Sequence, residues 1–401
     1  MEEIFTVAFL WLALAVFSTL IAYHLRVSVA LIEICVGVGV AAAFSAFELQ
    51  DILLPNADWV RFLASFGAVV LTFLAGAELD PLALRSKLTE VSVVGMVGFA
   101  APFLGCAAVA YYVLGWDAQA SWLCGVALST TSMAVVYAVM LETGFNNTEY
   151  GKGILGACFI NDLGTVIVLG LIFSPFTYKS MVFIFVSALA LAALPTATAW
   201  LTRHLAFRTA AIRTKWVMLV LLGLGSLALW SGSEAVLPAY IAGMVLAGSA
   251  AKDTHWIRRM RTLTVGFLTP FYFIRAGTLV SLPALVSAPL VFLALLAGKV
   301  VSKIFGLYPI IGVFRDDRNE RWYYTLMMST GLTFGTISSL YGLAHGIVTQ
   351  EQYSFLVAAI IASAVVPTLI ASRMFVPLHL LPRDEKQGKA PKQINGLSDE
   401  G

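Results

Sequence analysis

Apolar runs long enough to cross a lipid bilayer recur along most of the chain, and short polar segments separate them. A transmembrane helix needs about 20 predominantly apolar residues to cross a hydrocarbon core of about 30 Å. The pattern therefore predicts an all-α polytopic membrane protein with thirteen transmembrane helices. We expect the spans near residues 4–23, 27–47, 59–77, 89–114, 119–141, 150–173, 180–202, 214–231, 235–251, 262–282, 286–312, 321–344 and 353–376.

The composition agrees with this class of protein. Hydrophobic residues make up 59% of the chain and charged residues only 12%, whereas a soluble domain has about 45–50% and about 25%. The polar connections are too short to hold a folded domain outside the membrane. We therefore expect one transmembrane domain over residues 1–381 and a disordered cytoplasmic tail over residues 382–401.

The basic residues predict the orientation of the chain. With the N-terminus outside, 20 Lys and Arg residues fall in segments on the inside and only two, Arg61 and Lys179, fall outside. Cytoplasmic segments carry such an excess of Lys and Arg. The sequence therefore predicts an integral protein of the cell (inner or plasma) membrane, with its N-terminus outside and its C-terminus in the cytoplasm.

One acidic residue lies deep inside a predicted span. Asp162 falls near the middle of an otherwise uncharged run between Lys152 and Lys179. A charge at this depth costs about 2.5–3.5 kcal/mol on insertion scales and typically marks an ion or proton path. The alternative is a protonated Asp that hydrogen-bonds between helices. We favour the ion path, because two other predicted spans carry the interruptions that are typical of a transporter's binding site.

The remaining charges inside spans are few: Glu33, Glu78, Arg275, Lys299 and Lys303. The two lysines are four residues apart, so they share one helix face. We expect one of them to pair with a core acid, for which Glu78 is a candidate, although Glu78 also fits the cytoplasmic end of its helix. Arg275 either caps a broken helix or supports an ion site, and both interpretations stay open.

Two predicted spans carry signs of broken helices. The span 119–141 contains four consecutive hydroxyl residues, and the span 321–344 contains a stretch rich in Ser, Thr and Gly. Gly and Thr weaken a helix, and hydroxyl groups can replace its lost backbone hydrogen bonds. Paired interruptions in corresponding places point to the binding site of a transporter, whereas the alternative is that small residues only allow close helix packing. The residues are Ser129, Thr130, Thr131, Ser132, Ser329, Thr330, Gly331, Thr333, Gly335 and Thr336.

Six segments also resemble a known family in their order and intervals. They are FLAGAELD (73–80), STTS (129–132), FINDLG (159–164), PFYFIRAG (270–277), AGKVVSK (297–303) and STGLTFG (329–335). The chain resembles the cation:proton antiporter superfamily, on its NapA-like and Kef-like branch, up to about residue 376. The resemblance implies an NhaA/NapA-like fold with inverted repeats, two crossed discontinuous helices and a homodimer. It also implies a core subdomain that moves like an elevator against a dimerisation subdomain.

The resemblance also implies roles for individual residues. Asp162 matches the ion-binding carboxylate of the family, and Asn161 matches the residue before it, which is Asp in many electrogenic members. Thr130 and Thr131, with the adjoining Ser132, match the unwound segment that offers oxygen ligands to a monovalent cation. Thr330, Gly331 and Thr333 belong to the second discontinuous helix. Either Lys299 or Lys303 matches the core lysine, with Glu78 and Arg275 as further supporting charges.

This sequence departs from the family pattern in two places. It reads Gly-Leu-Thr at 331–333, where the sodium/proton-exchanger branch with Asn-Asp pairs usually has an Arg. It also shows no nucleotide-binding domain of the kind that the Kef branch usually carries, so we prefer Na⁺ over K⁺ or Li⁺. Because Asn161 cannot titrate, we expect an electroneutral exchange of one cation for one proton.

These observations favour a secondary active antiporter and not an enzyme. Burial raises the pKa of a carboxyl group and a nearby cation lowers it, so one carboxylate can hold either a proton or a cation. We expect no resident cofactor, no nucleic acid partner, and a homodimer in lipid. The alternative function is a sodium-coupled organic-solute symporter of similar architecture. The four cysteines lie on separate spans without metal-ligand spacing.

Overall fold

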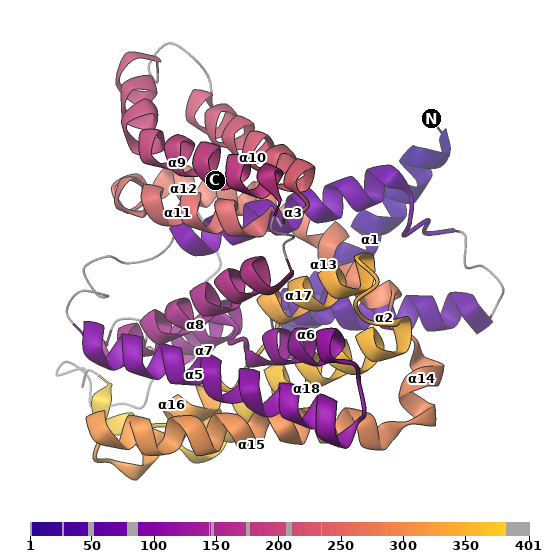
Figure 1. The fold of residues 1–401 in the computed structure, drawn as a ribbon, viewed down its shortest axis with the longest axis vertical. Helices are drawn as coiled ribbons and strands as arrows, with labels where there is room; N and C mark the ends of the chain where they lie inside the picture. Colours follow the sequence, from indigo (N-terminus) through magenta and orange to yellow (C-terminus); the bar gives the residue numbers. More distant parts are fainter. Residues whose placement is uncertain are drawn as a thin grey trace.

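The computed structural model describes residues 2–25, 28–46, 52–77, 87–143, 145, 148–173, 177–205, 211–233 and 235–381. All regular secondary structure in these residues is helical, as the sequence predicts, and the helices form two groups (Figure 1). The candidate Glu78 and the predicted tail over residues 382–401 lie outside the described residues.

In the first group, α3 packs against α11 and α13, α2 against α13, and α9 against α10 and α11. Its helices α9 to α12 occupy the upper part of Figure 1. The group contains α1 (Glu2–Leu25), α2 (Val29–Ala46), α3 (Asp58–Ala77), α9 (Tyr178–Leu205), α10 (Ile212–Ser231), α11 (Val236–Ala250), α12 (Thr254–Leu263), the π-helical η3 (Thr264–Leu268) and α13 (Thr269–Thr278).

In the second group, α5 packs against α6, α8 and α15, and α18 packs against α15 and α17. Its helices α5, α15, α16 and α18 occupy the lower part of Figure 1. The group contains α5 (Leu88–Ala108), the π-helical η1 (Val109–Val113), α6 (Ala118–Ser129), α7 (Met133–Thr143), α8 (Glu149–Phe173), α14 (Leu282–Ser287), α15 (Pro289–Phe314), α16 (Arg318–Met328), α17 (Thr333–Ala344), α18 (Gln350–Met374) and the 3₁₀ turn η4 (Leu378–Leu380).

The described helices follow the predicted spans closely. Eight of them are long and apolar enough to cross a membrane, and two shorter apolar helices cover 29–44 and 236–250. The predicted spans 119–141 and 321–344 are each divided into two helices, and the span 262–282 contains a π-helical turn before α13. The all-helical architecture is therefore confirmed, while the count of thirteen spans stays a prediction.

Two glycine pairs bring helices of the first group into close contact. A Cβ atom built on Gly277 of α13 would lie 3.0 Å from the Cα atom of Gly37 on α2. A Cβ atom built on Gly76 of α3 would lie 3.2 Å from the Cα atom of Gly243 on α11. Small residues allow such close approach of two backbones in membrane proteins, so larger residues at these positions would push the helices apart.

The two broken helices begin in the same way. Asp117 precedes α6 and accepts hydrogen bonds from the N–H groups of Gln119 and Ala120, at 3.0 and 3.1 Å. Asp317, 200 positions later, precedes α16 and accepts from the N–H groups of Asn319 and Glu320, at 2.8 and 3.0 Å. An aspartate in this position satisfies N–H groups that a helix start leaves free. The repeated cap indicates an internal repeat with a spacing of about 200 residues.

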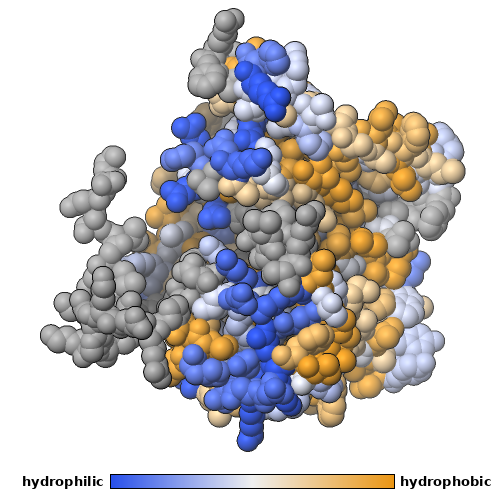
Figure 2. Space-filling view, turned by 90° about the vertical axis from the view of Figure 1, so that its left-hand side faces the viewer, coloured by the Kyte–Doolittle hydropathy of each residue, from blue (hydrophilic) through white to orange (hydrophobic). Residues whose placement is uncertain are grey.

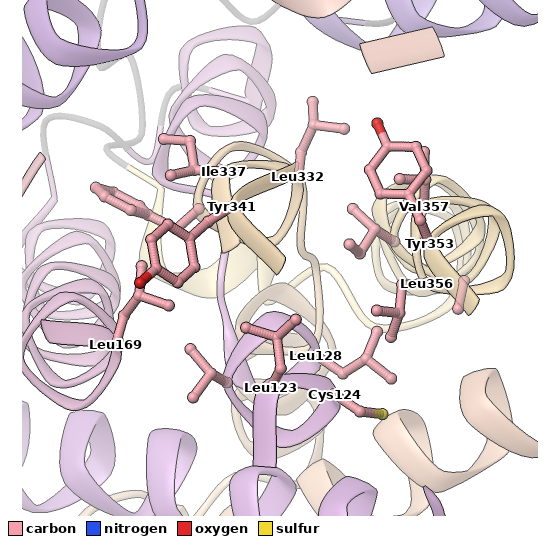
Figure 3. Close-up of a cluster of buried hydrophobic side chains, with 14 of the residues drawn as sticks. Leu123, Cys124, Leu128, Leu169, Leu332, Ile337, Tyr341, Tyr353, Leu356 and Val357 are labelled. Carbon is pink, nitrogen blue, oxygen red and sulfur yellow. The ribbon is translucent and has the colours of Figure 1, made fainter. Parts of the chain in front are cut away.

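A large apolar cluster packs the two broken helices against α8 and α18. Figure 3 shows Leu123 and Leu128 of α6 in one cluster with Leu332, just before α17, and Leu356 of α18. Tyr341 of α17 lies beside Leu169 of α8 in the same cluster. Burial of such side chains contributes about 1.5–3 kcal/mol each in soluble proteins. Since lipid is also apolar, here tight packing supplies most of the stabilisation.

The polar surface is concentrated at one end of the helix bundle. Figure 2 shows hydrophilic residues gathered on the side where α5 begins and α15 ends in Figure 1, while hydrophobic residues cover the adjoining flank. Large apolar side chains on α9 are exposed, among them Met181 at 74% and Phe185 at 71%. A helix bundle in lipid requires this pattern, because its flanks contact hydrocarbon and its helix ends contact water.

Candidate ion-binding site

The two predicted interruptions are both present. α6 ends at Ser129 and α7 begins at Met133, while α16 ends at Met328 and α17 begins at Thr333. Thr130–Ser132 and Ser329–Leu332 therefore form two non-helical segments in the middle of apolar spans, which we name the first and the second crossover. Irregular backbone at membrane depth persists only where protein or a polar cavity covers it. Both crossovers are buried.

Hydroxyl groups replace part of the hydrogen bonding that the helix ends lose. A helix end leaves its last carbonyl groups without intrahelical donors. At both helix breaks, a Ser followed by a Thr donates to carbonyl oxygens of the preceding turn. The bonds run from Ser129 Oγ to Val126 O (2.8 Å), Thr130 Oγ1 to Ala127 O (3.1 Å), Ser329 Oγ to Thr325 O (2.7 Å) and Thr330 Oγ1 to Met327 O (2.8 Å).

The two crossovers are bonded directly to each other. The Ser132 N–H group donates to Thr330 O at 3.0 Å. The Thr131 hydroxyl donates to Met328 O at 2.8 Å. Backbone groups that neither helix can satisfy alone are thus satisfied across the contact. This contact brings the Ser/Thr segments of 129–132 and 329–333 together, as the paired-interruption pattern predicts.

Both lysines of α15 reach the first crossover. Lys303 Nζ donates to Thr131 Oγ1 at 2.9 Å, and Lys299 Nζ donates to Thr130 O at 3.3 Å. Both side chains are fully buried. Because a helix C-terminus carries partial negative charge, the end of α6 attracts these two ammonium groups. A Cβ atom on Gly331 of the second crossover would collide with Lys299 Nζ.

The expected pairing of a lysine with a core acid stays a prediction, because the candidate acid Glu78 lies outside the residues that the structure describes. Neither Lys299 nor Lys303 forms an ion pair with any of them. Lys303 interacts electrostatically with Asp162 without a direct contact. The described partners of the two ammonium groups are a carbonyl and a hydroxyl oxygen of the first crossover, which the spacing of the sequence could not show.

Asp162 and Asn161 lie on α8 beside the first crossover. Asn161 is fully buried and Asp162 is 2% exposed. Asn161 Nδ2 donates to Ser129 O at 3.3 Å, which satisfies another free carbonyl of the α6 end. Asn161 Oδ1 and Asp162 Oδ1 are buried and have no hydrogen-bond partner among the described residues. A buried oxygen without a donor costs about 1–3 kcal/mol, so these two atoms mark a place suited to a ligand.

The other candidates are less central. Ser132 is buried, and its Oγ accepts from the Val135 N–H at 3.4 Å as a cap of α7. Thr333 is half-buried at the first position of α17. Arg275 lies away from the crossovers, in the last turn of α13, where its Nε donates to Pro55 O at 2.8 Å. The structure therefore ties Arg275 to the segment before α3 and not to the candidate site.

Comparison with known proteins agrees with this geometry. The family model "Sodium/hydrogen exchanger, transmembrane" matches residues 12–376 of the chain. The chain belongs to this family. The superfamily that the motifs suggested is thereby confirmed, and the family members are transporters.

The names of similar proteins include both sodium and potassium transporters. The probable Na⁺/H⁺ antiporter 3 of Methanocaldococcus jannaschii is 22% identical over 80% of this chain and 84% of its own length. The glutathione-regulated potassium-efflux system protein KefC of an Enterobacter species is 27% identical over 79% of this chain. The putative Na⁺/H⁺ antiporter YjbQ of Bacillus subtilis is 23% identical over 89% of this chain. The chain spans 53% of the length of KefC and 61% of that of YjbQ.

A solved structure shares the fold. The sodium proton antiporter MjNhaP1 of Methanocaldococcus jannaschii at pH 8 superimposes with a TM-score of 0.65. The match covers 93% of this chain and 98% of MjNhaP1, at 14% identity. The antiporter fold predicted from the sequence motifs is therefore confirmed.

Tyr240 of α11 is a contact to the site that sequence reasoning missed. Its hydroxyl donates to Phe159 O at 3.1 Å, one turn before Asp162. Its ring stacks on Phe159, with centroids 5.4 Å apart, and meets the edge of Phe334 at 5.8 Å. Tyr240 thus joins the first helix group to α8 and α17 of the second. A single Tyr in an apolar span is not a signal that sequence reasoning could have used.

A second polar network lies at the end of α15, away from the crossovers. Arg315 donates to both carboxylate oxygens of Glu90 on α5, at 2.8 and 2.9 Å. Glu320 of α16 lies 3.9 Å from Arg315 and bonds His379 at 2.9 Å. The Tyr150 hydroxyl of α8 donates to Glu320 O at 2.7 Å. The Arg315 pKa is raised, because its bonds to Glu90 outweigh the opposing effect of burial.

Proposed function

We propose that the protein exchanges a monovalent cation for protons across the cell membrane, with Asp162 as the shared binding site. The observation that carries this proposal is the pair of buried oxygens, Asp162 Oδ1 and Asn161 Oδ1, which have no donor in the described part of the chain. Asn161 is bonded to the end of α6, directly before the first crossover. The family to which the chain belongs supports it at the level of cation/proton exchange. Na⁺ is the preferred cation, and K⁺ and Li⁺ are the alternatives.

The chemistry of the site explains why a cation and a proton would compete. A carboxylate at this depth must be neutralised, because an isolated buried charge is costly. A proton neutralises it by bonding to a carboxylate oxygen, and a hard cation neutralises it by coordination. Asp162 supplies the charge, while Asn161 Oδ1 and the oxygens of Thr130, Thr131 and Ser132 supply dipoles for the cation. Because one carboxylate cannot hold both, binding of one ion releases the other.

The two lysines also compete with a cation for oxygens of the first crossover. Lys303 already occupies the Thr131 hydroxyl at 2.9 Å. A cation that uses this oxygen must share it with Lys303 or displace the ammonium group. Lys299 holds Thr130 O at 3.3 Å. We infer that Lys303 balances the charge of Asp162 when no cation is bound, and that Lys299 positions the crossover.

The two helix groups suggest how the site could open to each side. The second group carries Asp162, both lysines and both crossovers, and α8 and α17 meet the first group at Tyr240. We propose that the second group is the mobile core subdomain and moves like an elevator against the first. The exposed apolar side chains of α9 provide a surface for a homodimer. We also propose that the N-terminus lies outside the cell and the C-terminus in the cytoplasm.

Proteoliposomes loaded with a pH-sensitive dye test the function. The purified protein is reconstituted, a pH gradient is imposed, and Na⁺, K⁺, Li⁺ or choline is added outside. We expect Na⁺ to dissipate the gradient at the lowest concentration and choline to have no effect, with empty liposomes as the control. A gradient that only a cation together with an organic solute dissipates would instead support the sodium-coupled symporter.

A further inference from the structure

A cavity of about 420 Å³ lies between the two helix groups, apart from the crossovers. α3, α10, α11 and α13 line one side of it, and α17 lines the other. Most of the lining side chains are apolar, among them Phe66, Leu221 and Ile337. This size is within the range of about 300–1,000 Å³ that small-molecule sites occupy.

The rim of the cavity is apolar and open. Phe62, Leu222 and Leu229 line it and are 56%, 43% and 68% exposed. They belong to membrane-spanning helices α3 and α10, so their exposed faces contact hydrocarbon when the protein is in a bilayer. A ligand can therefore enter from the lipid without crossing water.

The charged residues that line the cavity are both arginines, Arg61 of α3 and Arg275 of α13. Neither forms an ion pair in the part of the chain that the structure describes. Arg275 donates through Nε to Pro55 O, and its two Nη nitrogens make no hydrogen bond to a described residue. Asp58, one turn before Arg61, does not line the cavity. Two like charges without an acid create a place for an anion.

We propose that this cavity binds an anionic phospholipid, with an acyl chain among the apolar side chains and the phosphate between Arg61 and Arg275. The open apolar rim favours a membrane lipid over a soluble anion, because a soluble anion would gain nothing from the apolar lining. The paired arginines favour an anionic over a zwitterionic headgroup, since guanidinium groups bind phosphate through paired hydrogen bonds. The lipid would lie between the two helix groups and touch α17, the helix that follows the second crossover.

Thermal unfolding of the delipidated protein in detergent tests this proposal. Phosphatidylglycerol is titrated, with phosphatidylcholine and glycerol 3-phosphate as the comparison ligands, and native mass spectrometry counts the bound lipids. We expect only phosphatidylglycerol to raise the Tm strongly and to remain bound. Loss of one charged hydrogen-bond partner should weaken binding roughly tenfold, so Arg61→Gln and Arg275→Gln should each require about ten times more lipid.

Two further variants separate the parts of the proposal. Ser226→Phe fills the cavity from α10 without changing its charges, and we expect it to abolish the effect of the lipid. Lys179→Gln removes a basic residue that does not line the cavity, and it should leave the effect unchanged. Equal stabilisation by phosphatidylcholine, equal stabilisation by glycerol 3-phosphate, or equal loss in Lys179→Gln would each overturn the proposal. A change of oligomeric state in Ser226→Phe, measured by light scattering, would show that a second copy covers the cavity instead.

Discussion

The first and second crossovers are built alike but are surrounded differently. Each follows a half-helix that begins after an aspartate cap, and a Ser-Thr pair marks each break, with equivalent residues 200 positions apart. The first crossover accepts hydrogen bonds from Lys299 and Lys303, and the last residue of α6 before it accepts one from Asn161. The second supplies the Thr330 carbonyl and Gly331, whose missing side chain leaves space for Lys299. The two repeats thus each supply one broken helix, while the polar side chains gather around the first of them.

The positions equivalent to the lysines show how the two halves diverged. Residues 200 positions before Lys299 and Lys303 are Phe99 and Phe103 of α5, whose rings stack with centroids 5.4 Å apart. α5 and α15 pack against each other. One helix of this pair therefore contributes apolar packing and the other contributes charge. A binding site for a single ion needs this asymmetry, because two symmetric sets of buried lysines would repel each other and the cation.

The largest expected effect concerns the acid beside the first crossover. Asp162→Asn should reduce cation/proton exchange to the level of empty liposomes, because an amide neither releases a proton nor balances the charge of a cation. The measurement is dissipation of a pH gradient by Na⁺. Cys158→Ser, one turn earlier on α8, is the matched control and should keep its exchange. Exchange at the wild-type rate by a folded Asp162→Asn protein would contradict the role of Asp162.

The two lysines should have separable effects. Lys303→Ala removes the charge that acts on Asp162 and the donor to Thr131, so exchange should fall by roughly 10- to 150-fold if about 1.5–3 kcal/mol is lost. Lys299→Ala leaves Thr130 O without this donor and should lower the melting temperature more than the exchange rate. Both variants are compared by exchange per folded protein and by Tm in detergent. Equal losses of exchange and of Tm in the two variants would show that the lysines act as one unit.

The close packing of the second crossover can be tested by one methyl group. Gly331→Ala would push its Cβ into Lys299 Nζ, and overpacking of this kind costs about 1–3 kcal/mol. We expect a lower Tm and slower exchange. Gly248→Ala, where nothing lies within 4 Å of the added Cβ, should be neutral in both measurements. An unchanged Tm in Gly331→Ala would mean that Lys299 moves aside freely.

Arg315, in the turn before the second half-helix, pairs with Glu90 of α5. The position 200 residues before Arg315 is Gly115, with φ +69°. Glu90→Gln should destabilise the protein by about 3–5 kcal/mol at most, because it leaves a largely buried Arg315 without its partner. The control is Glu149→Gln, which breaks the pair with Lys87 at 87% exposure of the acid. Exposed pairs contribute about 0–1 kcal/mol. Equal losses of unfolding free energy in Glu90→Gln and Glu149→Gln, measured by chemical unfolding, would contradict the expected difference between the buried and the exposed pair.

The smallest expected effect is the response to voltage. If Asp162 is the only titrating group in the exchange cycle, one cation replaces one proton and the exchange is electroneutral. A membrane potential imposed with K⁺ and valinomycin, at zero pH gradient, should then drive no net proton movement through Na⁺/H⁺ exchange. Proton movement that requires both Na⁺ and Asp162 would show that Lys303 also releases a proton during the cycle.

The sequence by itself determined the features that depend on local chemistry. Apolar runs of membrane length predicted the helices, and clusters of Ser, Thr and Gly predicted the breaks near Thr130 and Thr330, because backbone and hydroxyl groups compete within a few residues. The lone Asp162 stood out because an intramembrane charge is costly wherever its helix lies.

Only the tertiary structure decided which groups meet. The pattern placed Lys299 and Lys303 on one face of α15, but only the rotation of that helix directs them to Thr130 and Thr131. In the same way, the placement of α13 directs Arg275 away from the crossovers, to Pro55 and the cavity. Such contacts join residues more than 150 positions apart, and they depend on helix rotation and crossing, which the spacing of residues along one helix does not specify.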